Sequence, residues 1–370
     1  LKLKRDKKQP KKSKSITTNV KSSLRTKLAA FFVLMSIIPL ICMGAVVTYI
    51  FRDAITSEVQ DKANIIVNNL NDNIDLFIEQ NKNLVAFIAS TKTVRTMDQD
   101  QISSFLYDVA QQNPQVLRIY VANIEDQSVF AVPFATFPDN YNLADESWYS
   151  GALEAKGNFI SNVRVDSMSG NSIVSISNVI LSDTGQPVGV ISADVSLVSL
   201  TRIVMNMKVG EEGFAFITDK DGTVVAHKDY KYVKARENYS KYDFVKKALN
   251  SEKGFTTYTD DEGKEQFVAF GNYKLLGWGI FVQQPTDEAF ARVSSITKTV
   301  VTISLVVALI SLGLSMFLGR IITNPLQALL HVTQSVANND LTGVVKLKDN
   351  TEIGALAASF DTMTLHLKSL

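Results

Sequence analysis

Two long apolar stretches divide this chain of 370 residues into a polar middle and two flanks. They run over 28–51 and 299–319, and neither contains Asp, Glu, Lys or Arg. A helix of about 20 apolar residues crosses a hydrocarbon layer of roughly 30 Å. The pattern therefore predicts two transmembrane helices. We expect the first to be retained, because its 24 residues exceed the apolar core of a cleaved signal peptide.

The polar middle, 52–298, begins with a helical pattern and continues with strand patterns. From Asp53 to about Ala89, apolar residues recur at steps of three and four, which predicts one long stalk helix continuing out of the first span. A second helix is expected at about 101–112. Five stretches rich in Val, Ile, Phe and Ser then predict a five-stranded antiparallel sheet. They are 115–124, 128–133, 159–166, 172–181 and 187–195.

A shorter copy of this order follows a connecting helix at about 197–207. It has a strand pair, a helix near 242–250 and three more strands. The expected strands are 213–219, 223–227, 254–259, 265–272 and 278–283. The repetition suggests two similar subdomains of one α+β fold, and the alternative is a single irregular β domain. His227 ends one of these strands, so we expect it at the surface or in a turn.

Charge is distributed unevenly, although the formal net charge is only +1. Residues 1–27 hold eleven basic side chains and one acid, Asp6, which predicts a cytoplasmic N-terminus and places 52–298 outside. Beside a membrane span, a basic tail is a topology signal, so no nucleic-acid partner is expected. The single cysteine, Cys42, lies in the first apolar stretch, and the three histidines are scattered. We therefore expect no disulfide in the outer region, no metal and no cofactor.

The segment 320–370 carries two amphipathic patterns joined by a connector at about 338–351. The second pattern places apolar residues at alternating steps of three and four, which forms a heptad seam. The seam residues are Ile353, Leu356, Phe360, Met363, Leu367 and Leu370. A helix this short is marginal alone and needs partner helices. The chain has no phosphate-binding loop or nucleophile elbow, so we do not expect an enzyme.

Three segments of the polar middle resemble the double Cache sensor of bacterial methyl-accepting chemotaxis proteins. They are 185–197 (GQPVGVISADVSL), 210–227 (GEEGFAFITDKDGTVVAH) and 275–285 (LLGWGIFVQQP). The resemblance implies two antiparallel-sheet subdomains of the PAS-like type. The distal one would span about 90–196 and the proximal one about 208–285. A small ligand, such as an amino acid or an amine, would bind in the distal subdomain.

The segment 320–370 resembles the HAMP linker of the same receptors. Pro325 and the sequence Glu352-Ile353-Gly354 stand in their expected places, although Thr351 replaces the usual aspartate. This resemblance implies a homodimer in the cell membrane, with four cytoplasmic helices in a parallel bundle. Because the chain stops as this linker ends, we expect an output domain beyond Leu370. The expected output domain is a methyl-accepting signalling coiled coil, and the alternative is a histidine kinase or a diguanylate cyclase. A third class for the whole protein is an adhesion or wall-sensing protein.

Seven residues of the distal subdomain are candidates for the ligand site. They are Tyr141, Glu146, Trp148, Tyr149, Arg164, Asp166 and Asp194. Tyr141, the Trp148-Tyr149 pair and Asp194 match the spacing of amino-acid-binding relatives. In those relatives an arginine grips the ligand carboxylate, the aspartate takes its ammonium, and aromatic faces enclose both. Asp194 is the most informative residue, because burying an acid in an apolar strand is costly without a partner.

Two positions depart from that pattern. Glu146 stands where the family has its arginine, and Arg164 stands where a second tyrosine is common. Three hypotheses remain open: Arg164 binds the ligand carboxylate, Glu146 and Arg164 pair and close the site, or Glu146 and Asp194 select a cationic amine. Trp148 and Tyr149 could also belong simply to the core.

Overall fold

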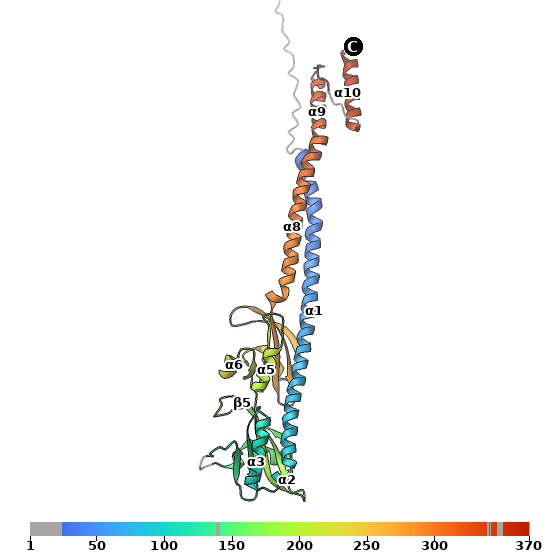
Figure 1. Cartoon of the computed structure of the whole chain (residues 1–370). Coiled ribbons are helices and arrows are strands. Elements are labelled where there is room, and N and C mark those ends of the chain that lie inside the picture. The colour runs from blue at the N-terminus through green and yellow to red at the C-terminus, as the bar shows by residue number, and fades with distance from the viewer. Residues whose placement is uncertain (1–23, 138–140, 339, 341, 346–350, 370) are drawn as a thin grey trace, which may run out of the picture. The chain divides into compact units, whose positions relative to one another are not determined.

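The computed structural model describes residues 24–137, 141–338, 340, 342–345 and 351–369 (Figure 1). The basic residues up to Lys21 therefore lie outside the described part of the chain. Contacts divide the structure into two compact units. One is Arg52–Arg292, which we call the two-sheet region, and the other contains the apolar helices and the C-terminal helices.

The helix α1, Leu24–Ser90, is continuous from the first apolar stretch through the predicted stalk. The helix α8, Thr286–Leu318, contains most of the second stretch. Both are long and apolar enough to cross a membrane, by length and composition. Within their unit they touch: the hydroxyl oxygens of Ser36 and Ser311 lie 2.8 Å apart. The expected α+β architecture with a long N-terminal helix is confirmed.

A short π-helix, Gly319–Thr323, interrupts the chain between α8 and α9, Asn324–Ala337. Pro325 at the start of α9 explains it, because proline has no N–H and its ring clashes with the carbonyl four residues earlier. The last helix, α10, spans Glu352–Ser369. Its buried Ala357 packs with Leu329 and Val345. The predicted connector between α9 and α10 lies partly outside the described residues.

The first sheet has the order β2-β1-β6-β5-β3, with β4 also paired to β5, and all pairs are antiparallel. Its strands are β1 (Val116–Asn123), β2 (Val129–Val132), β3 (Phe159–Ile160), β4 (Arg164–Val165), β5 (Ser172–Leu181) and β6 (Pro187–Ser196). The prediction of one strand at 159–166 was wrong. The Ser175 N–H donates to the Ser161 hydroxyl at 2.8 Å instead of to a backbone carbonyl, so the ladder breaks into β3 and β4.

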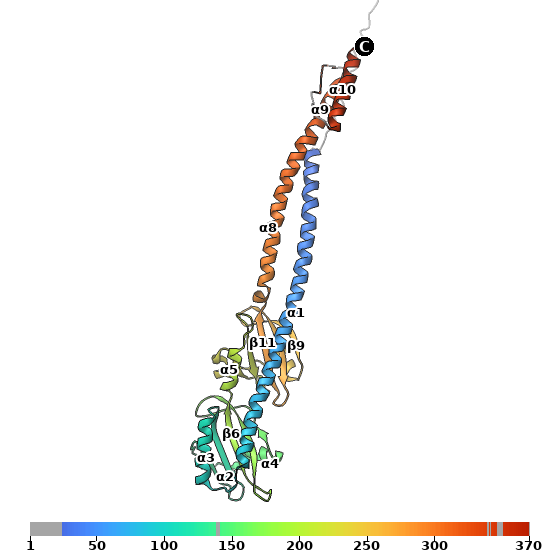
Figure 2. The same ribbon diagram turned by 45° about the vertical axis from the view of Figure 1, so that its right-hand side comes forward.

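The second sheet has the corresponding order β8-β7-β11-β10-β9. Its strands are β7 (Phe214–Thr218), β8 (Val224–His227), β9 (Gly254–Thr259), β10 (Glu265–Tyr273) and β11 (Trp278–Pro285). Figures 1 and 2 both show α1 running along the two sheets. One continuous core unites apolar residues of α1 with one face of each sheet, among them Leu70, Ile74, Ile191 and Ile280.

Short helices complete the two-sheet region. The first sheet is accompanied by α2 (Lys92–Arg95), α3 (Gln99–Gln112), a short 3-10 turn (Leu143–Asp145) and α4 (Ser147–Ala155), and α5 (Val198–Asn206) leads to the second sheet. The second sheet carries α6 (Tyr230–Lys234) and α7 (Asp243–Leu249). On the sheet faces opposite the main core, α4 packs beside β5 and β6, and α7 packs beside β10 and β11.

His227 corrects a second expectation. It is only 3 % exposed, because α6 follows β8 and places Tyr232 against the imidazole, with ring centres 4.5 Å apart. Burial lowers the pKa of His227 from 6.5 to about 4, so the ring is neutral at pH 7. Its Nδ1 accepts a hydrogen bond from the Asp229 N–H at 2.9 Å. His227 is therefore a core residue of the second sheet and not a surface residue.

Candidate functional site

The central strand β6 positions Asp194, which is fully buried. Alternation along β6 turns Ile191, Ala193 and Val195 into the main core, so Asp194 faces the α4 side of the sheet. Four hydrogen bonds end on its carboxylate: one from the Tyr120 hydroxyl at 3.0 Å, one from the Ser175 hydroxyl at 2.7 Å, and one to each oxygen from Arg164 Nη2 at 2.7 Å.

The register of the sheet brings these partners together. Arg118 on β1 and Ser175 on β5 are the direct neighbours of Asp194 on either side. Arg164 reaches in from β4, and its side chain remains 42 % exposed while that of Asp194 is 1 % exposed. Asp194 therefore has the partner that its burial demands, and its acceptor capacity is largely used.

A second ion pair lies on the same face. The Arg118 side chain is 12 % exposed, and its nearer nitrogen lies 3.7 Å from Asp166 Oδ1. Arg118 Nη1 also donates to the Tyr120 hydroxyl at 3.1 Å, which links the two ion pairs. Asp166 accepts from the Ser169 N–H at 2.7 Å, which stabilises the turn after β4. Two arginines and two aspartates thus balance each other in one network.

Sequence reasoning missed three members of this network: Arg118, Tyr120 and Ser175. A signal existed for the first two. Arg118 interrupts an otherwise apolar strand, and Tyr120 follows two residues later on the same face. Ser175 carried no such signal, because serine is ordinary in these strands and only the register places it beside Asp194.

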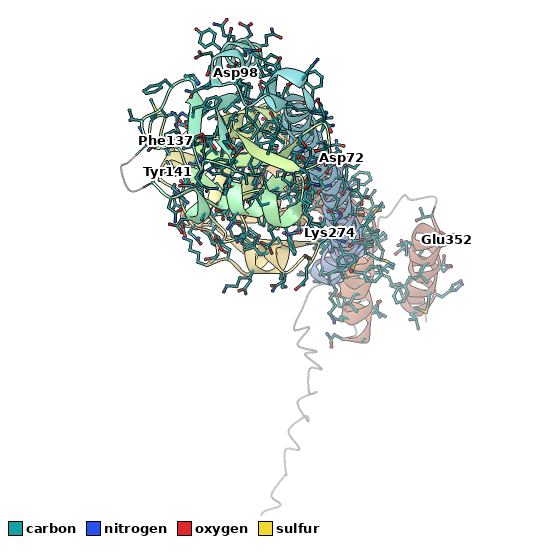
Figure 3. The ribbon with its side chains drawn as sticks, turned by 90° about the horizontal axis from the view of Figure 1, so that it is seen from below. Asp72, Asp98, Phe137, Tyr141, Lys274 and Glu352 are labelled. Atoms are coloured by element: carbon teal, nitrogen blue, oxygen red, sulfur yellow. The ribbon has the colours of Figure 1, made fainter. Side chains whose placement is uncertain are left out.

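An aromatic group stands beside the charged network. Trp148 in the first turn of α4 stacks on Tyr120, with ring centres 5.6 Å apart. Tyr141 and Phe137, which are labelled in Figure 3, pack 4.7 Å apart. Trp148 and Tyr149 are 3 % and 5 % exposed, so both also serve the core, as the simpler hypothesis held. The structure brings the aromatic candidates together in one cluster.

Glu146 occupies the cap position just before α4 and is half-buried. Burial, followed by the negative charge of Glu146, raises the pKa of Tyr141 above its ordinary value. Within the residues that the structure describes, no hydrogen bond or ion pair joins the Glu146 side chain to another residue. The hypothesis of a Glu146–Arg164 pair does not hold, since Arg164 pairs with Asp194.

The described residues contain no group of three or more His, Cys, Asp or Glu side chains that could hold a metal ion. The polar side chains of the site are instead suited to recognition of a small organic molecule. They combine one carboxylate that has no bonded partner among the described residues, one partly exposed guanidinium and several aromatic faces.

The structure thus places two antiparallel sheets in tandem along a helix that continues into an apolar stretch. The chain belongs to the Cache family, because the family model described as Cache domain matches residues 50–293. A second model, described as HAMP domain, matches residues 317–369. The predicted resemblance to chemoreceptors with a Cache sensor and a HAMP linker is thereby confirmed.

Curated relatives support this assignment. The methyl-accepting chemotaxis protein McpC of Bacillus subtilis is 26% identical over 354 residues, which cover 94% of this chain and 52% of McpC. TlpB of the same organism is 30% identical over 259 residues, covering 70% of this chain and 38% of TlpB. The chain thus spans about half the length of curated relatives such as McpC.

Solved structures show the same fold. The ligand-binding domain of Mlp24 with asparagine has a TM-score of 0.53 at 23% identity, covering 66% of this chain and 98% of that one. The ligand-binding domain of the Campylobacter jejuni chemoreceptor Tlp3 with 4-methylisoleucine has a TM-score of 0.52 at 14% identity, covering 64% and 94%. At these identities the likeness concerns the fold alone.

Proposed function

We propose that this chain is the sensing and transmitting part of a bacterial methyl-accepting chemoreceptor. Its relatives are chemotaxis proteins, which favours this output over a histidine kinase or a diguanylate cyclase. The N-terminus and 320–370 are cytoplasmic and 52–298 is extracytoplasmic, as the basic N-terminal segment favours. The distal subdomain, about 90–196, receives the ligand, and the proximal one, about 208–285, connects it to the second span.

The ligand is a small amine, held by Glu146 and by the faces of Tyr141 and Trp148. The observation that carries this proposal is the saturation of Asp194 by Arg164, Ser175 and Tyr120. Arg118 and Asp166 likewise balance each other. Glu146 is then the acid left over, so the cluster carries one excess negative charge. An ammonium group beside an unpaired, half-buried carboxylate and aromatic faces gains both ionic and cation–π attraction.

An amino acid is the second candidate, because Arg164 keeps some capacity to bind a carboxylate. Its Nε and Nη2 groups bond to Ser175 and Asp194, whereas the side chain as a whole is 42 % exposed. Its Nη1 group is then the donor left for a ligand carboxylate, while Glu146 takes the ammonium. The solved Mlp24 domain, which binds asparagine, makes this candidate worth testing.

Isothermal titration calorimetry of the full chain in lipid nanodiscs distinguishes the two candidate ligands, an amine and an amino acid. We would titrate ethanolamine, putrescine and a set of L-amino acids against wild type, Glu146→Gln and Glu154→Gln. Glu154 is an exposed acid on α4, the helix that Glu146 precedes, and serves as the matched control. We expect amine binding that weakens at least about tenfold in Glu146→Gln and stays unchanged in Glu154→Gln. Amine binding that is indifferent to Glu146→Gln would contradict the proposed role of Glu146.

The chain assembles as a homodimer, and a stripe on α1 supports this part of the proposal. Ile65, Leu76 and Phe87 are 58%, 56% and 64% exposed, although each is large and apolar. They recur every eleven residues, which is close to three helical turns, so they form one line along the helix. We propose that α1 of a second copy covers this line. Sedimentation of detergent-solubilised Leu76→Lys should show loss of dimer, whereas Asn68→Lys, which is exposed but off the line, should not.

A further inference from the structure

A carboxylate joins the first turn of α8 to the loop that precedes β7. Glu288 Oε1 accepts from the Glu211 N–H at 2.8 Å, and Oε2 accepts from the Glu212 N–H at 3.0 Å. Gln284 Nε2 also donates to Oε1 at 2.8 Å. Successive backbone N–H groups that converge on one anion form a concave binding site for negative charge. We call this contact the Glu288 clamp.

Gly210 makes the close approach possible. Its φ angle is +59°, and a Cβ atom built on it would overlap Glu288 Oε1 and Gln284 Nε2. A side chain at this position would push the carboxylate away and would also strain the backbone. The contact therefore depends on a glycine in the loop and on an acid that stands 78 positions later in the chain.

The electrostatics of Glu288 favour the clamped state at neutral pH. Burial raises the pKa of this carboxyl, but the N–H groups of Glu211 and Glu212 outweigh it and hold the pKa below its ordinary value. Glu288 is thus ionised when it binds the loop. Hydrogen bonds to an ionised acceptor are roughly twice as strong as neutral ones.

The loop held by Glu288 is connected to the first sheet by a single short helix, α5. Strand β6, which carries Asp194, ends at Ser196, and α5 begins two residues later. Leu200 and Val204 fix α5 in the core, each 1% exposed. The loop then turns at Val209 and Gly213, which form an isolated β-bridge. One short, packed helix therefore lies between β6 and the residues that bind Glu288.

The other contacts of the first turns of α8 are made with the second sheet and with α1. The Thr286 hydroxyl donates to the Glu265 carbonyl on β10 at 3.1 Å. Phe290 packs on Phe267 of β10. The Arg52 guanidinium of α1 lies 4.8 Å from the centre of the Phe290 ring. These contacts hold the start of α8 against the second sheet and α1. The Glu288 clamp adds the connection to α5.

We propose that the Glu288 clamp transmits changes at the distal site to α8, the helix that continues into the second apolar stretch. This inference rests on the proposed sensing role of the distal subdomain. It assigns Glu288 and Gly210 to transmission and not to ligand binding. Loss of the clamp should leave the distal network intact while α8 no longer responds to it.

Hydrogen exchange measured by mass spectrometry on the full chain in nanodiscs tests this without any ligand. Asp194→Asn serves as the perturbation of the distal network. We expect it to change exchange in residues 286–292 at least about threefold in the wild type and to have no effect there in a Glu288→Gln background. Glu288→Gln alone should speed exchange at residues 211–213 about tenfold, which corresponds to the loss of about 1.4 kcal/mol of local protection.

Two further variants separate the clamp from general destabilisation. Gly210→Ala should reproduce the effect of Glu288→Gln through the opposite partner. Glu211→Gln removes an acid from the same loop but keeps the N–H donor, so it should behave as wild type. The proposal is wrong if Asp194→Asn leaves 286–292 unchanged in the wild type, or changes it equally in both backgrounds. Because the amine titration does not involve Glu288, the proposed ligand and the clamp can fail independently.

Discussion

The two sheets share a strand order but differ in what they place beneath their short helix. Under α4, the first sheet presents the polar row of Arg118, Asp194 and Ser175. Under α7, the second sheet presents aromatic rings instead: Phe216 and Phe281 stack with ring centres 4.7 Å apart, and Phe244 of α7 packs on Phe281. The same fold therefore presents a polar face in one sheet and an aromatic face in the other. A polar face can recognise a ligand at some cost in stability, whereas an aromatic face maximises buried apolar area.

Removing an aromatic ring from the second sheet should have the largest effect. Phe281 is fully buried on β11, so Phe281→Ala leaves a cavity and should lower the free energy of unfolding by about 3–5 kcal/mol. Chemical denaturation monitored by circular dichroism measures the loss. Leu275→Ala, at a site 57% exposed, is the control and should cost less than about 0.5 kcal/mol. A loss below about 1 kcal/mol in Phe281→Ala would show that this aromatic face is not a tight core.

The second sheet should also contain a pH-dependent element. The pKa of His227 is lowered from 6.5 to about 4 in the folded protein, so the unfolded chain binds more protons between these values. The free energy of unfolding should therefore fall as the pH drops from about 6.5 to about 4 and then level off, with a total of about 3 kcal/mol from this residue.

His227→Phe keeps a ring against Phe214 and Tyr232 but cannot titrate. Denaturation curves at pH 4 and pH 7 should therefore differ less in this variant than in wild type. The exposed His331→Gln is the matched control and should retain the wild-type difference. An equal difference in wild type and His227→Phe would rule out His227 as the source.

In the first sheet, breaking the polar row should cost less than emptying the aromatic core. Asp194→Asn keeps the shape but weakens the bonds from Arg164, Tyr120 and Ser175, and we expect a loss of about 1–3 kcal/mol. Arg164 is partly exposed and can regain water, which limits the loss. In a double-mutant cycle, Asp194→Asn with Arg164→Gln should lose less than the sum of the two single variants. Strict additivity would mean that the ion pair does not couple these residues.

The smallest effect should come from an exposed hydrogen bond between the two subdomains. The Tyr230 hydroxyl of α6 donates to Asn171 Oδ1, next to the turn after β4, at 2.9 Å. Tyr230→Phe removes one exposed hydrogen bond and should cost about 0.5–1.5 kcal/mol or less. Thermal unfolding compared with Tyr107→Phe, an exposed tyrosine of α3, isolates the contribution. If the unfolding temperature of Tyr230→Phe fell much further than that of Tyr107→Phe, this hydrogen bond would couple the unfolding of the two sheets.

Local patterns in the sequence were sufficient for most elements. The three- and four-residue steps predicted the stalk part of α1, and strand patterns placed β5 and β9 with the bounds that the structure shows. These elements follow from periodicity, which is a property of neighbouring residues. The split of β3 from β4 was not predictable in this way, since it depends on one hydroxyl, that of Ser161, competing with a backbone carbonyl.

By itself, the sequence determined two apolar helices, two repeated sheets and two amphipathic patterns at the C-terminal end, and it predicted seven candidate residues for a ligand site. Only the tertiary structure decided which charged and polar side chains form hydrogen bonds and ion pairs with one another. The register of β1, β6 and β5 sets Arg118 and Ser175 beside Asp194, and β4 brings Arg164 to it, which leaves Glu146 without a bonded partner among the described residues. The reason is physical: charge pairing depends on distances across strands, and a linear pattern of residue types does not contain those distances.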